Sequence, residues 1–581
     1  MHKIASLLIM STFAMSHAQP APSPRFCTTQ NSNDWVDRSI QVQQKYSRVL
    51  VVTASTAPAT VEVAPLDLNN PTARPAPTRY KVDQVFSTLQ AAGDAAEGGD
   101  LVAIMPGTYA GMFLREKASC GDGKYIHFKA MGPPGQVIIN NWSADAQGNP
   151  LSRHMIHLFA SHHVILQGLH LVGQTGPGLP QAGPTSGIMI GASFIHTRKM
   201  THHIVLTEIF SHNHRTWGMH STDSYTVLMQ DSCFALSCKE HSAYVSDGSD
   251  DYVIRRNIFF GSGGCGLQCN IDPDTCLRKM SGMEEFAELA PLQGNRQWAE
   301  SMLKLATRKF GKYNFPDGIG ENFIIEENVI NGNGRFTGGA GLNLAALTDS
   351  LIQNNLIYDN YAHGFAMWDN NNVFERTAMK PGPASAAEIT GPDGLPLFGC
   401  RNNLIRNNTV LMNVPERYAL GAINGSYGCT LRNNVAVNDG GPSLEVTGNS
   451  VYKLDSGYNV LHSVLLNRYS MWSTVPYSSN TPAMPADIAA LATHLDKDNH
   501  SALDIDLGAF GRQVVRYSTN SWIIIENGSW RLNPDRPDFH PRGNSQLLSG
   551  TGDRAQLPPA DLDHRPRASA DIGCYRAAEK D

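Results

Sequence analysis

The chain has 581 residues, of which 17% are charged, and its formal net charge is −6 at pH 7. This weakly acidic balance excludes the basic surface that nucleic-acid-binding proteins need, so no nucleic-acid partner is expected. The 52 glycines favour many tight turns between short strands over long helices. A chain of this length would ordinarily divide into several domains, but a solenoid of stacked repeats can grow without doing so.

The first eighteen residues predict export from the cytoplasm. Lys3 is followed by an apolar stretch at positions 4–14 and by Ser16-His17-Ala18, which carries the small residues that a signal peptidase requires. We therefore expect a signal peptide at residues 1–18, cleavage after Ala18, and a secreted or periplasmic protein. The apolar stretch is too short to span a bilayer, and no other segment could, so no membrane association is expected.

The segment that follows, residues 19–80, is rich in Pro, Ala and Thr and predicts an irregular N-terminal extension. All ten cysteines lie beyond residue 18, where an oxidising compartment favours disulfide bonds. Cys265, Cys269 and Cys276 are close together, but no second Cys-x-x-Cys pair accompanies them. Disulfides are therefore predicted in preference to a zinc site, with the pairing left open.

A short strand followed by asparagine recurs through the middle of the chain. Asn comes three residues after a central aliphatic residue in Tyr252-Val-Ile-Arg-Arg-Asn257, Phe323-Ile-Ile-Glu-Glu-Asn328, Ser350-Leu-Ile-Gln-Asn-Asn355, Asn403-Leu-Ile-Arg-Asn-Asn408 and Cys429-Thr-Leu-Arg-Asn-Asn434. Weaker copies centre on Ile165, Val205 and Val227. The central aliphatic residues of successive copies are 22 to 27 residues apart in the shortest cases, which fits one coil each. We interpret the separation of 53 residues as two coils, and those of 40 and 71 residues as coils with insertions. This period predicts an all-β, right-handed parallel β-helix, since leucine-rich repeats need a leucine consensus and propeller blades need about forty residues.

In such a solenoid, equivalent strands stack about 4.8 Å apart. The repeated asparagines would then form a hydrogen-bonded ladder along one corner. We interpret them as structural and not as catalytic residues.

Three further stretches resemble one known group. Residues 86–109 contain a short apolar helix pattern and then Leu101-Val-Ala-Ile104; Glu240-His-Ser-Ala-Tyr-Val-Ser246 precedes Ile254-Arg-Arg-Asn257; and the chain ends with Asp561-Leu-Asp-His-Arg565 and Asp571-Ile-Gly-Cys-Tyr575. Together these segments resemble the pectate-lyase-like β-helix superfamily of secreted bacterial proteins. The resemblance implies an N-terminal capping helix, middle coils and a last turn, respectively. The superfamily includes lyases, hydrolases, epimerases and non-enzymes, so the resemblance implies no single reaction. The Asp-Pro-His-Asp motif of mannuronan epimerases is matched only in part, by Ile271-Asp-Pro-Asp274.

The predicted organisation is a parallel β-helix at residues 81–461 and a C-terminal cap region at residues 462–581. Residues 277–315 interrupt the repeat, and Trp298, Met302 and Leu305 recur there at helical spacing, which predicts an amphipathic helical insertion. This insertion could either cover the flank of the solenoid or form a wall beside a substrate groove. Residues 380–397 are rich in Pro and Gly and predict a loop, and residues 485–495 predict a helix.

A second strand in each coil carries a row of polar residues. These strands include Gly218-Met-His-Ser221, Ser242-Ala-Tyr-Val-Ser246, Gly266-Leu-Gln-Cys-Asn270, Gly341-Leu-Asn-Leu-Ala345, Gly364-Phe-Ala-Met-Trp368 and Gly421-Ala-Ile-Asn-Gly425. Because strand side chains alternate between faces, the apolar residues point inward and the polar ones outward. The predicted outward column is His220, Tyr244, Gln268 and Asn343, and it ends at Ala366 and Ile423. A parallel column contains Ser246, Asn270, Ala345 and Trp368, and alternation adds Glu240 and Asp272 at the edges.

This local polar patch, flanked by a tryptophan that could stack on a sugar ring, predicts a polysaccharide-binding and catalytic site. For β-elimination on a uronic-acid polymer, His220 would serve as base or charge stabiliser and Tyr244 as acid. Glu240 would orient His220 or His241, while substrate binding would fall to Gln268, Asn270, Asn343 and Trp368. For hydrolysis of a neutral glycan, Glu240 and Asp272 would be the pair of carboxylates. A glycan-binding solenoid without turnover is the third hypothesis.

Thirteen of the 21 histidines lie between His127 and His241, including the pairs His162-His163 and His202-His203. Their spacing matches no His-Glu-x-x-His helix, so no metal ligands are assigned, and a metal centre is left as an open alternative. The cofactor, including any dependence on calcium, and the oligomeric state are left open.

Overall fold

The computed structural model describes residues 32–575 except for 44, 71–72, 74, 118–122, 175–182, 293–295, 313, 369–397, 424–425, 439, 447–449, 451–453, 464–468, 471–499, 502–522, 527–528, 534–538, 541–549 and 568. The predicted signal peptide, the loop at 380–397 and the helix at 485–495 lie outside the described residues. Among those that are described, no helix combines the length and the apolar character needed to cross a membrane.

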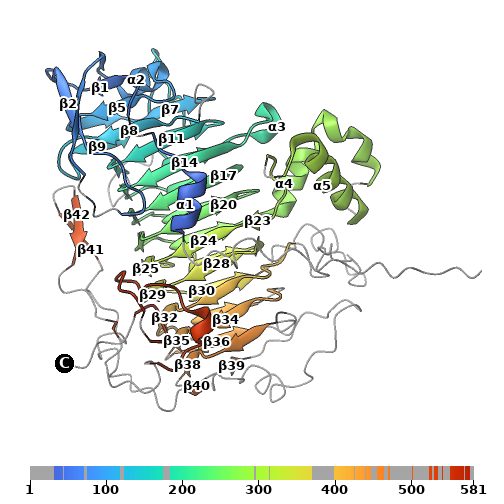
Figure 1. Ribbon diagram of the computed structural model, residues 1–581. Helices are drawn as coiled ribbons and strands as arrows, with labels where there is room; N and C mark the ends of the chain where they lie inside the picture. The colour runs from blue at the N-terminus through green and yellow to red at the C-terminus, as the bar shows by residue number, and fades with distance from the viewer. Residues whose placement is uncertain are drawn as a thin grey trace, which may run out of the picture.

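Three long parallel sheets run along an elongated stack (Figure 1). Each coil contributes one strand to each sheet, as when β17 (Ser224–Gln230), β18 (Cys233–Ala235) and β19 (Ala243–Ser246) are followed by their parallel neighbours β20 (Asp250–Arg255), β21 (Ile258–Phe260) and β22 (Leu267–Asn270). Inward side chains fill one continuous core of aliphatic and aromatic residues along the stack. The chain is therefore a right-handed parallel β-helix, as predicted from the repeat.

The first sheet has thirteen strands. In spatial order they are β4 (Gln84–Phe86), β1 (Val49–Val52), β5 (Leu101–Ile104), β8 (Ile126–Ala130), β11 (His162–Gln167), β14 (Thr201–Thr207), β17, β20, β24 (Phe323–Glu326), β28 (Leu351–Gln353), β31 (Leu404–Arg406), β34 (Thr430–Arg432) and β37 (Asp455–Gly457).

The second sheet has twelve strands, and the third has eleven. The second contains β6 (Gly107–Ala110), β9 (Val137–Asn141), β12 (His170–Val172), β15 (Phe210–His212), β18, β21, β25 (Val329–Asn331), β29 (Leu356–Tyr358), β32 (Thr409–Met412), β35 (Val435–Asn438), β38 (Val460–Ser463) and β40 (His500–Ser501). The third contains β7 (Met112–Arg115), β10 (His154–Phe159), β13 (Ser186–Gly191), β16 (Trp217–Ser221), β19, β22, β26 (Ala340–Ala345), β30 (His363–Trp368), β33 (Leu420–Ala422), β36 (Leu444–Val446) and β39 (Tyr469–Ser470).

The remaining strands form small two-stranded pairs outside these sheets. They are β2 (Thr60–Val63) with β3 (Thr78–Lys81), β23 (Gly320–Glu321) with β27 (Leu347–Thr348), and β41 (Ile523–Glu526) with β42 (Ser529–Leu532). The helices are α1 (Asn33–Ser39), α2 (Leu89–Ala95), α3 (Phe194–Thr197), α4 (Pro273–Ser281), η1 (Glu284–Leu292), α5 (Arg296–Phe310) and η6 (Arg554–Gln556). Leu89 and Ala92 of α2 join the N-terminal end of the core, which is the place expected of a capping helix.

The asparagine corner is a ladder of buried amides. Asn355 Nδ2 donates to the Ile325 carbonyl at 2.9 Å and to Asn408 Oδ1 at 2.9 Å, while its own Oδ1 accepts from the backbone and side chain of Asn328. The ladder continues through Asn434 to Asn459. A second, shorter ladder, from Asn333 to Asn360, was not predicted; it follows the strands of the second sheet.

The register confirms the five strong repeats and corrects the weaker ones. Ile254, Ile325, Ile352, Ile405 and Leu431 pair in sequence on adjacent strands. The 53-residue interval before Ile405 is therefore one coil with an insertion and not two coils. In the preceding coils the partners of Ile254 are Met229, Leu206 and Leu166. The predicted centres at Val227, Val205 and Ile165 were wrong by one or two residues because these coils have no corner asparagine to fix the register.

The N-terminal segment is more regular than its composition indicated. Strand β1 joins the first sheet between β4 and β5, and α1 lies against the outer face of that sheet. The outward residues of this face, such as Ile165 and Val205, are aliphatic and need a cover. Trp35 of α1 supplies part of it and donates from Nε1 to Asp251 Oδ1 at 2.8 Å. The extension therefore completes the packing of the solenoid.

The chain end also departs from its expected place. Residues 561–575 do not form the last turn but return to the middle coils, where the Cys574 backbone N–H donates to Thr409 Oγ1 at 3.0 Å. Ile572, Cys574 and Tyr575 are buried against outward residues of the second sheet, including Leu411. This apolar outer face explains the docking, because without the C-terminal segment it would contact water.

The predicted helical insertion is present as α4, η1 and α5, which project from the stack beside α3 (Figure 1). Met302 and Leu305 are buried, as the helical spacing indicated. They belong to a separate core that also contains Phe194 of α3 and Met200. The insertion is thus packed on the corner that precedes β14.

No disulfide joins any of the eight cysteines that the structure describes, so the prediction of disulfides is wrong for these residues. Cys269 is an inward core residue of β22. Cys265 donates from Sγ to Gln268 Oε1 at 3.0 Å, and Cys276 accepts from the Gly248 backbone N–H at 3.0 Å. These thiols therefore fill tight interior positions at different corners instead of facing one another.

Candidate functional site

The third sheet carries the predicted polar column on four adjacent strands. His220 of β16 pairs in register with Tyr244 of β19, Tyr244 with Gln268 of β22, and Gln268 with Asn343 of β26. The next partner is Ala366, which ends the column as expected. The residue after it is Gly421 and not Ile423, because β33 begins at Leu420, the partner of Phe365.

A neighbouring column runs two residues further along the same strands. It contains Ser246, Asn270, Ala345 and Trp368, as the alternation predicted. Trp368 Nε1 donates to Asn343 Oδ1 at 2.8 Å, and Asn343 Nδ2 donates to Gln268 Oε1 at 3.3 Å. Gln268 Oε1 also accepts from the Cys265 thiol. These hydrogen bonds use the side-chain oxygen of Gln268 as an acceptor, while the amide nitrogen of Gln268 donates to no described residue.

His220 and Tyr244 form a parallel ring stack, with centroids 5.0 Å apart and an interplanar angle of 10°. Trp217, at the start of β16, also packs against His220, with ring centroids 4.4 Å apart, and its ring lies 6.1 Å from that of Tyr244. Both rings of the stack are partly buried, which makes the face less exposed than the sequence indicated. Burial lowers the pKa of His220 to about 3, with further lowering by His154, His241 and Lys279, and burial raises the pKa of Tyr244.

Hydrogen bonds define which ring nitrogen of His220 carries its proton. Ser246 Oγ donates to the Ser221 carbonyl at 3.1 Å, so it can only accept from His220 Nε2, which lies 3.0 Å away. Nδ1 of the neutral imidazole is then the unprotonated nitrogen, and it bonds to no described residue. The hydroxyl of Tyr244 accepts from Asn270 Nδ2 at 3.4 Å and donates to no described residue.

Glu240 and His241 lie beside this stack, on the turn that precedes β19. Trp217 Nε1 donates to Glu240 Oε2 at 2.8 Å, which fixes the carboxylate. His241 Nε2 is 3.9 Å from the same oxygen, and its Nδ1 accepts from the Cys265 backbone N–H at 2.9 Å. Burial lowers the pKa of His241 to about 4. The ring of His241 meets that of Tyr244 edge to face at 5.2 Å, so these residues form one cluster with the column.

Asp272 has a different environment, as the N-cap of α4. Its Oδ1 accepts from the Thr275 backbone N–H at 3.1 Å, and its Oδ2 accepts from the Thr275 hydroxyl at 2.9 Å. Pro273 follows at the first helical position, an arrangement typical of helix starts. Both carboxylate oxygens therefore stabilise the beginning of the insertion.

Comparison with known proteins agrees with this architecture. A family model described as "Right handed beta helix region" matches residues 317–467. This match agrees with the right-handed parallel β-helix that the strand pairing shows. No curated protein matches the sequence at a significant level.

Solved structures that are similar to this chain include pectate lyase Pel9A, with 13% identity, a TM-score of 0.46, and coverage of 92% of this chain and 97% of that one. The A-module of mannuronan C-5 epimerase AlgE6 from Azotobacter vinelandii has 14% identity and a TM-score of 0.37, with coverage of 71% and 93%. An alginate lyase from Paenibacillus has 13% identity and a TM-score of 0.32, with coverage of 61% and 91%. These likenesses concern the fold and not the reaction.

Two features of this β-helix were missed from the sequence. Trp217 is one residue before the aligned segment, so its role as the anchor of Glu240 had no signal in the repeat. Lys279 of α4 lies in the insertion, yet its ammonium group is 2.8 Å from Asp247 Oδ2 and contributes to the lowered pKa of His220. Only the folding of the insertion onto the stack brings Lys279 near the column.

A cavity of about 740 Å³ lies elsewhere, between the N-terminal segment, the first sheet and residues 559–564. Its charged lining is internally paired. Arg256 Nε is 2.7 Å from Asp231 Oδ1, and buried Arg255 donates to Ser32 Oγ, the Leu68 carbonyl and Gln230 Oε1. This cavity lies where the N-terminal extension packs on the solenoid.

Proposed function

We propose that the protein is a carbohydrate-active enzyme that cleaves an extracellular polysaccharide at the polar column of the third sheet. One observation carries this proposal. His220 Nδ1, the Tyr244 hydroxyl proton and the Gln268 amide nitrogen lie on three successive strands, and none of them bonds to a described residue. An acceptor and two donors of this kind, fixed by stacking and by neighbouring hydrogen bonds, suit a polyhydroxylated ligand with acidic groups.

The reaction that these groups support best is β-elimination on a uronic-acid polymer. A base removes the C5 proton, the electron pair forms the C4–C5 double bond, and the C4–O bond breaks with protonation of the leaving oxygen. His220 would accept the C5 proton at Nδ1, and Tyr244 would protonate the leaving oxygen. Burial keeps the Tyr244 hydroxyl protonated, because it raises the pKa of that group.

The substrate carboxylate would lie against the amides. Gln268 Nε2 is available as a donor, and Asn270 and Asn343 extend the amide surface on either side. An anionic carboxylate at this position would favour the protonated form of His220 and raise its pKa from about 3 toward the range of an effective base. Trp368, held by its bond to Asn343, offers a ring face to an adjacent sugar.

The hydrolase alternative has weaker support. It requires Glu240 and Asp272 as an acid and a base or nucleophile, but both oxygens of Asp272 already cap α4. The non-catalytic alternative requires only the binding groups. It does not account for a neutral histidine beside a protonated tyrosine on the same face.

The experiment that tests the proposal is incubation of the purified protein with pectate and alginate as acidic polymers and with a neutral glucan. Ultraviolet absorbance from an unsaturated uronate product, together with new reducing ends, is expected with an acidic polymer. New reducing ends without that absorbance would support the hydrolase instead. Binding without any product would contradict both enzymatic proposals and support the glycan-binding solenoid.

A further inference from the structure

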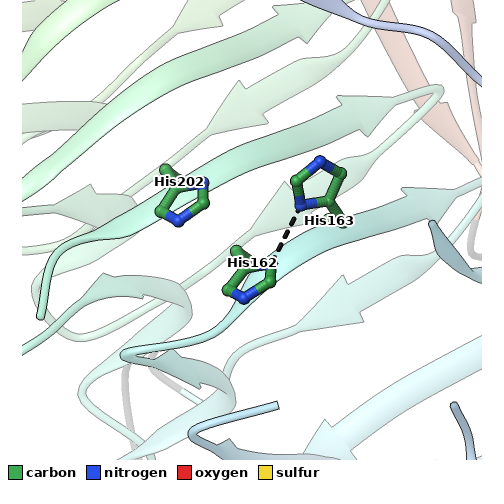
Figure 2. Close-up of side chains that lie close together, drawn as sticks. All are labelled: His162, His163 and His202. Carbon is green, nitrogen blue, oxygen red and sulfur yellow. Dashed lines mark hydrogen bonds between the residues drawn. The ribbon is translucent and has the colours of Figure 1, made fainter. Parts of the chain in front are cut away.

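Two pairs of adjacent histidines meet at the corner where the chain enters the first sheet. His162 at the start of β11 pairs in register with His202 of β14. Their rings stack with centroids 4.6 Å apart at an angle of 6°, and His163 stacks on His203 at 4.4 Å and 12°. Figure 2 shows His162 and His163 turned toward each other and His202 on the adjacent strand. This cluster is separate from the polar column of the third sheet.

A left-handed backbone conformation explains how neighbouring side chains come together here. In a regular strand, residues 162 and 163 would point to opposite faces. His163 and His203, however, have φ values of 55° and 52°, which interrupts the alternation. The equivalent positions in two later coils have similar φ values and are occupied by Asp251 and Asn322. Histidine thus replaces the usual Asn or Asp in the two coils where a second histidine precedes it.

The nitrogen atoms have the spacing of metal ligands. One ring nitrogen from each of His162, His163 and His202 lies within 4.8 Å of the others. The Nδ1 atoms of His162 and His163 are 2.9 Å apart. Zinc–nitrogen bonds of about 2.0–2.1 Å in a tetrahedral site place ligand nitrogens about 3.3 Å apart. The rings of His162 and His202, now stacked nearly parallel, would turn toward a common point to bind one ion. We infer that His162, His163 and His202 bind a divalent transition-metal ion of the Zn²⁺ class.

The protonation state of the cluster favours a metal over protons. Burial, together with the neighbouring histidines, lowers the pKa of both His163 and His202 to about 3, and burial lowers that of His162. Neutral imidazole is the form that ligates metals, so protons compete little near neutral pH. Lys199 lies in the neighbouring cleft, its charge contributes to the lowered pKa of His162, and its ammonium group pairs with Glu116 at 2.8 Å.

The position of the cluster leaves room for a further metal ligand. His162 and His202 line a cleft of about 370 Å³, together with Tyr225, Lys199 and Phe310 of the helical insertion. Tyr225 takes the place of a third histidine in this row, because it pairs with His202 and stacks on it at 4.8 Å. Three protein ligands with an open position toward a cleft are the arrangement of an exchangeable zinc site, which would complete its coordination with water or an oxygen of a bound molecule.

The test compares two matched variants of the full chain after treatment with a chelator. His163→Asn and His203→Asn put the same residue at equivalent left-handed positions, where Asn already occurs in a later coil, so both should fold. Zn²⁺ titration by calorimetry should give one ion per chain for the wild type. His163→Asn should weaken binding by about a hundredfold or more, because it removes a ligand. His203→Asn should weaken binding by about tenfold, because His203 acts on the site only through its bond to His202 Nδ1.

A third variant protects the test against misfolding. His202→Tyr copies the residue of the next coil, keeps the ring stack and should also weaken Zn²⁺ binding by about a hundredfold or more. Absence of stoichiometric Zn²⁺ binding, or equal weakening by His163→Asn and His203→Asn, would overturn the inference.

Discussion

Tyr244→Phe is the most direct perturbation of the proposed catalytic face, because it deletes one oxygen and leaves the ring in place. The phenyl ring retains its stack on His220 at 5.0 Å and its contact with Trp217 at 6.1 Å. Among the described residues the hydroxyl has one hydrogen-bond partner, Asn270, at the long distance of 3.4 Å. Its loss should therefore cost at most about 1 kcal/mol of folding free energy.

The effect on the rate should be far larger than the effect on stability. Loss of a general acid typically lowers a rate by about 10²–10⁴-fold, which corresponds to about 3–5 kcal/mol of transition-state stabilisation. The rate is followed by the ultraviolet absorbance of the unsaturated product on the acidic polymer that the wild type cleaves. Tyr418→Phe is the matched control, since Tyr418 also stacks on a histidine, His363, but is buried with only 3% of its surface exposed.

His220→Gln provides the second arm of this experiment. If His220 and Tyr244 act in the same elimination step, the double variant should be little slower than the slower single variant. For wild-type kcat/KM, the pKa of about 3 predicts that protonation of His220 in the free protein limits activity only below about pH 4, and not near its ordinary value of 6.5. Full activity of Tyr244→Phe, with Tyr418→Phe also active, would refute the assignment of Tyr244 as the acid.

Three further predictions concern the rest of the chain. Asn355→Ala should lower the free energy of unfolding by about 3 kcal/mol or more, because the buried partners of the ladder lose their bonds. The folded fraction of this variant should keep its specific activity. An inactive variant with wild-type stability would contradict the structural role of Asn355. Burial lowers the pKa of His127 and His214 to about 3, so the unfolded chain binds more protons than the folded chain below about pH 6.5. The free energy of unfolding should therefore fall by about 2 kcal/mol per such histidine between pH 7 and pH 5. Urea unfolding that is unchanged between these two pH values would contradict this prediction. N-terminal sequencing of exported protein should begin near Gln19, and an intact Met1 there would exclude the predicted cleavage.

The repeated sequence determined the architecture because the coils with a corner Asn share one pattern of apolar and polar residues. Aliphatic residues at inward positions followed by Asn at a corner can be satisfied together only if equivalent strands stack, so Ile254 and Ile325 had to become neighbours. The same period placed His220, Tyr244, Gln268 and Asn343 in one column, since alternation within each strand gives their direction and the coil gives their register. Where a coil lacked the corner Asn, as around Met229, the register could not be read correctly.

Tertiary structure decided what the repeat does not encode. Asp272 looked like an outward carboxylate by alternation, but the strand ends at Asn270 and Asp272 begins a helix instead. Lys279 reaches Asp247 only because the insertion folds back on the stack. The histidine cluster appears in the sequence as two adjacent pairs, each at the same position relative to the strand that it begins. Its convergence depends on the positive φ of His163, a backbone feature with no signature in hydrophobic periodicity. Periodicity therefore fixes which residues share a face, whereas contacts across insertions, termini and left-handed corners arise from packing between segments that the repeat does not relate.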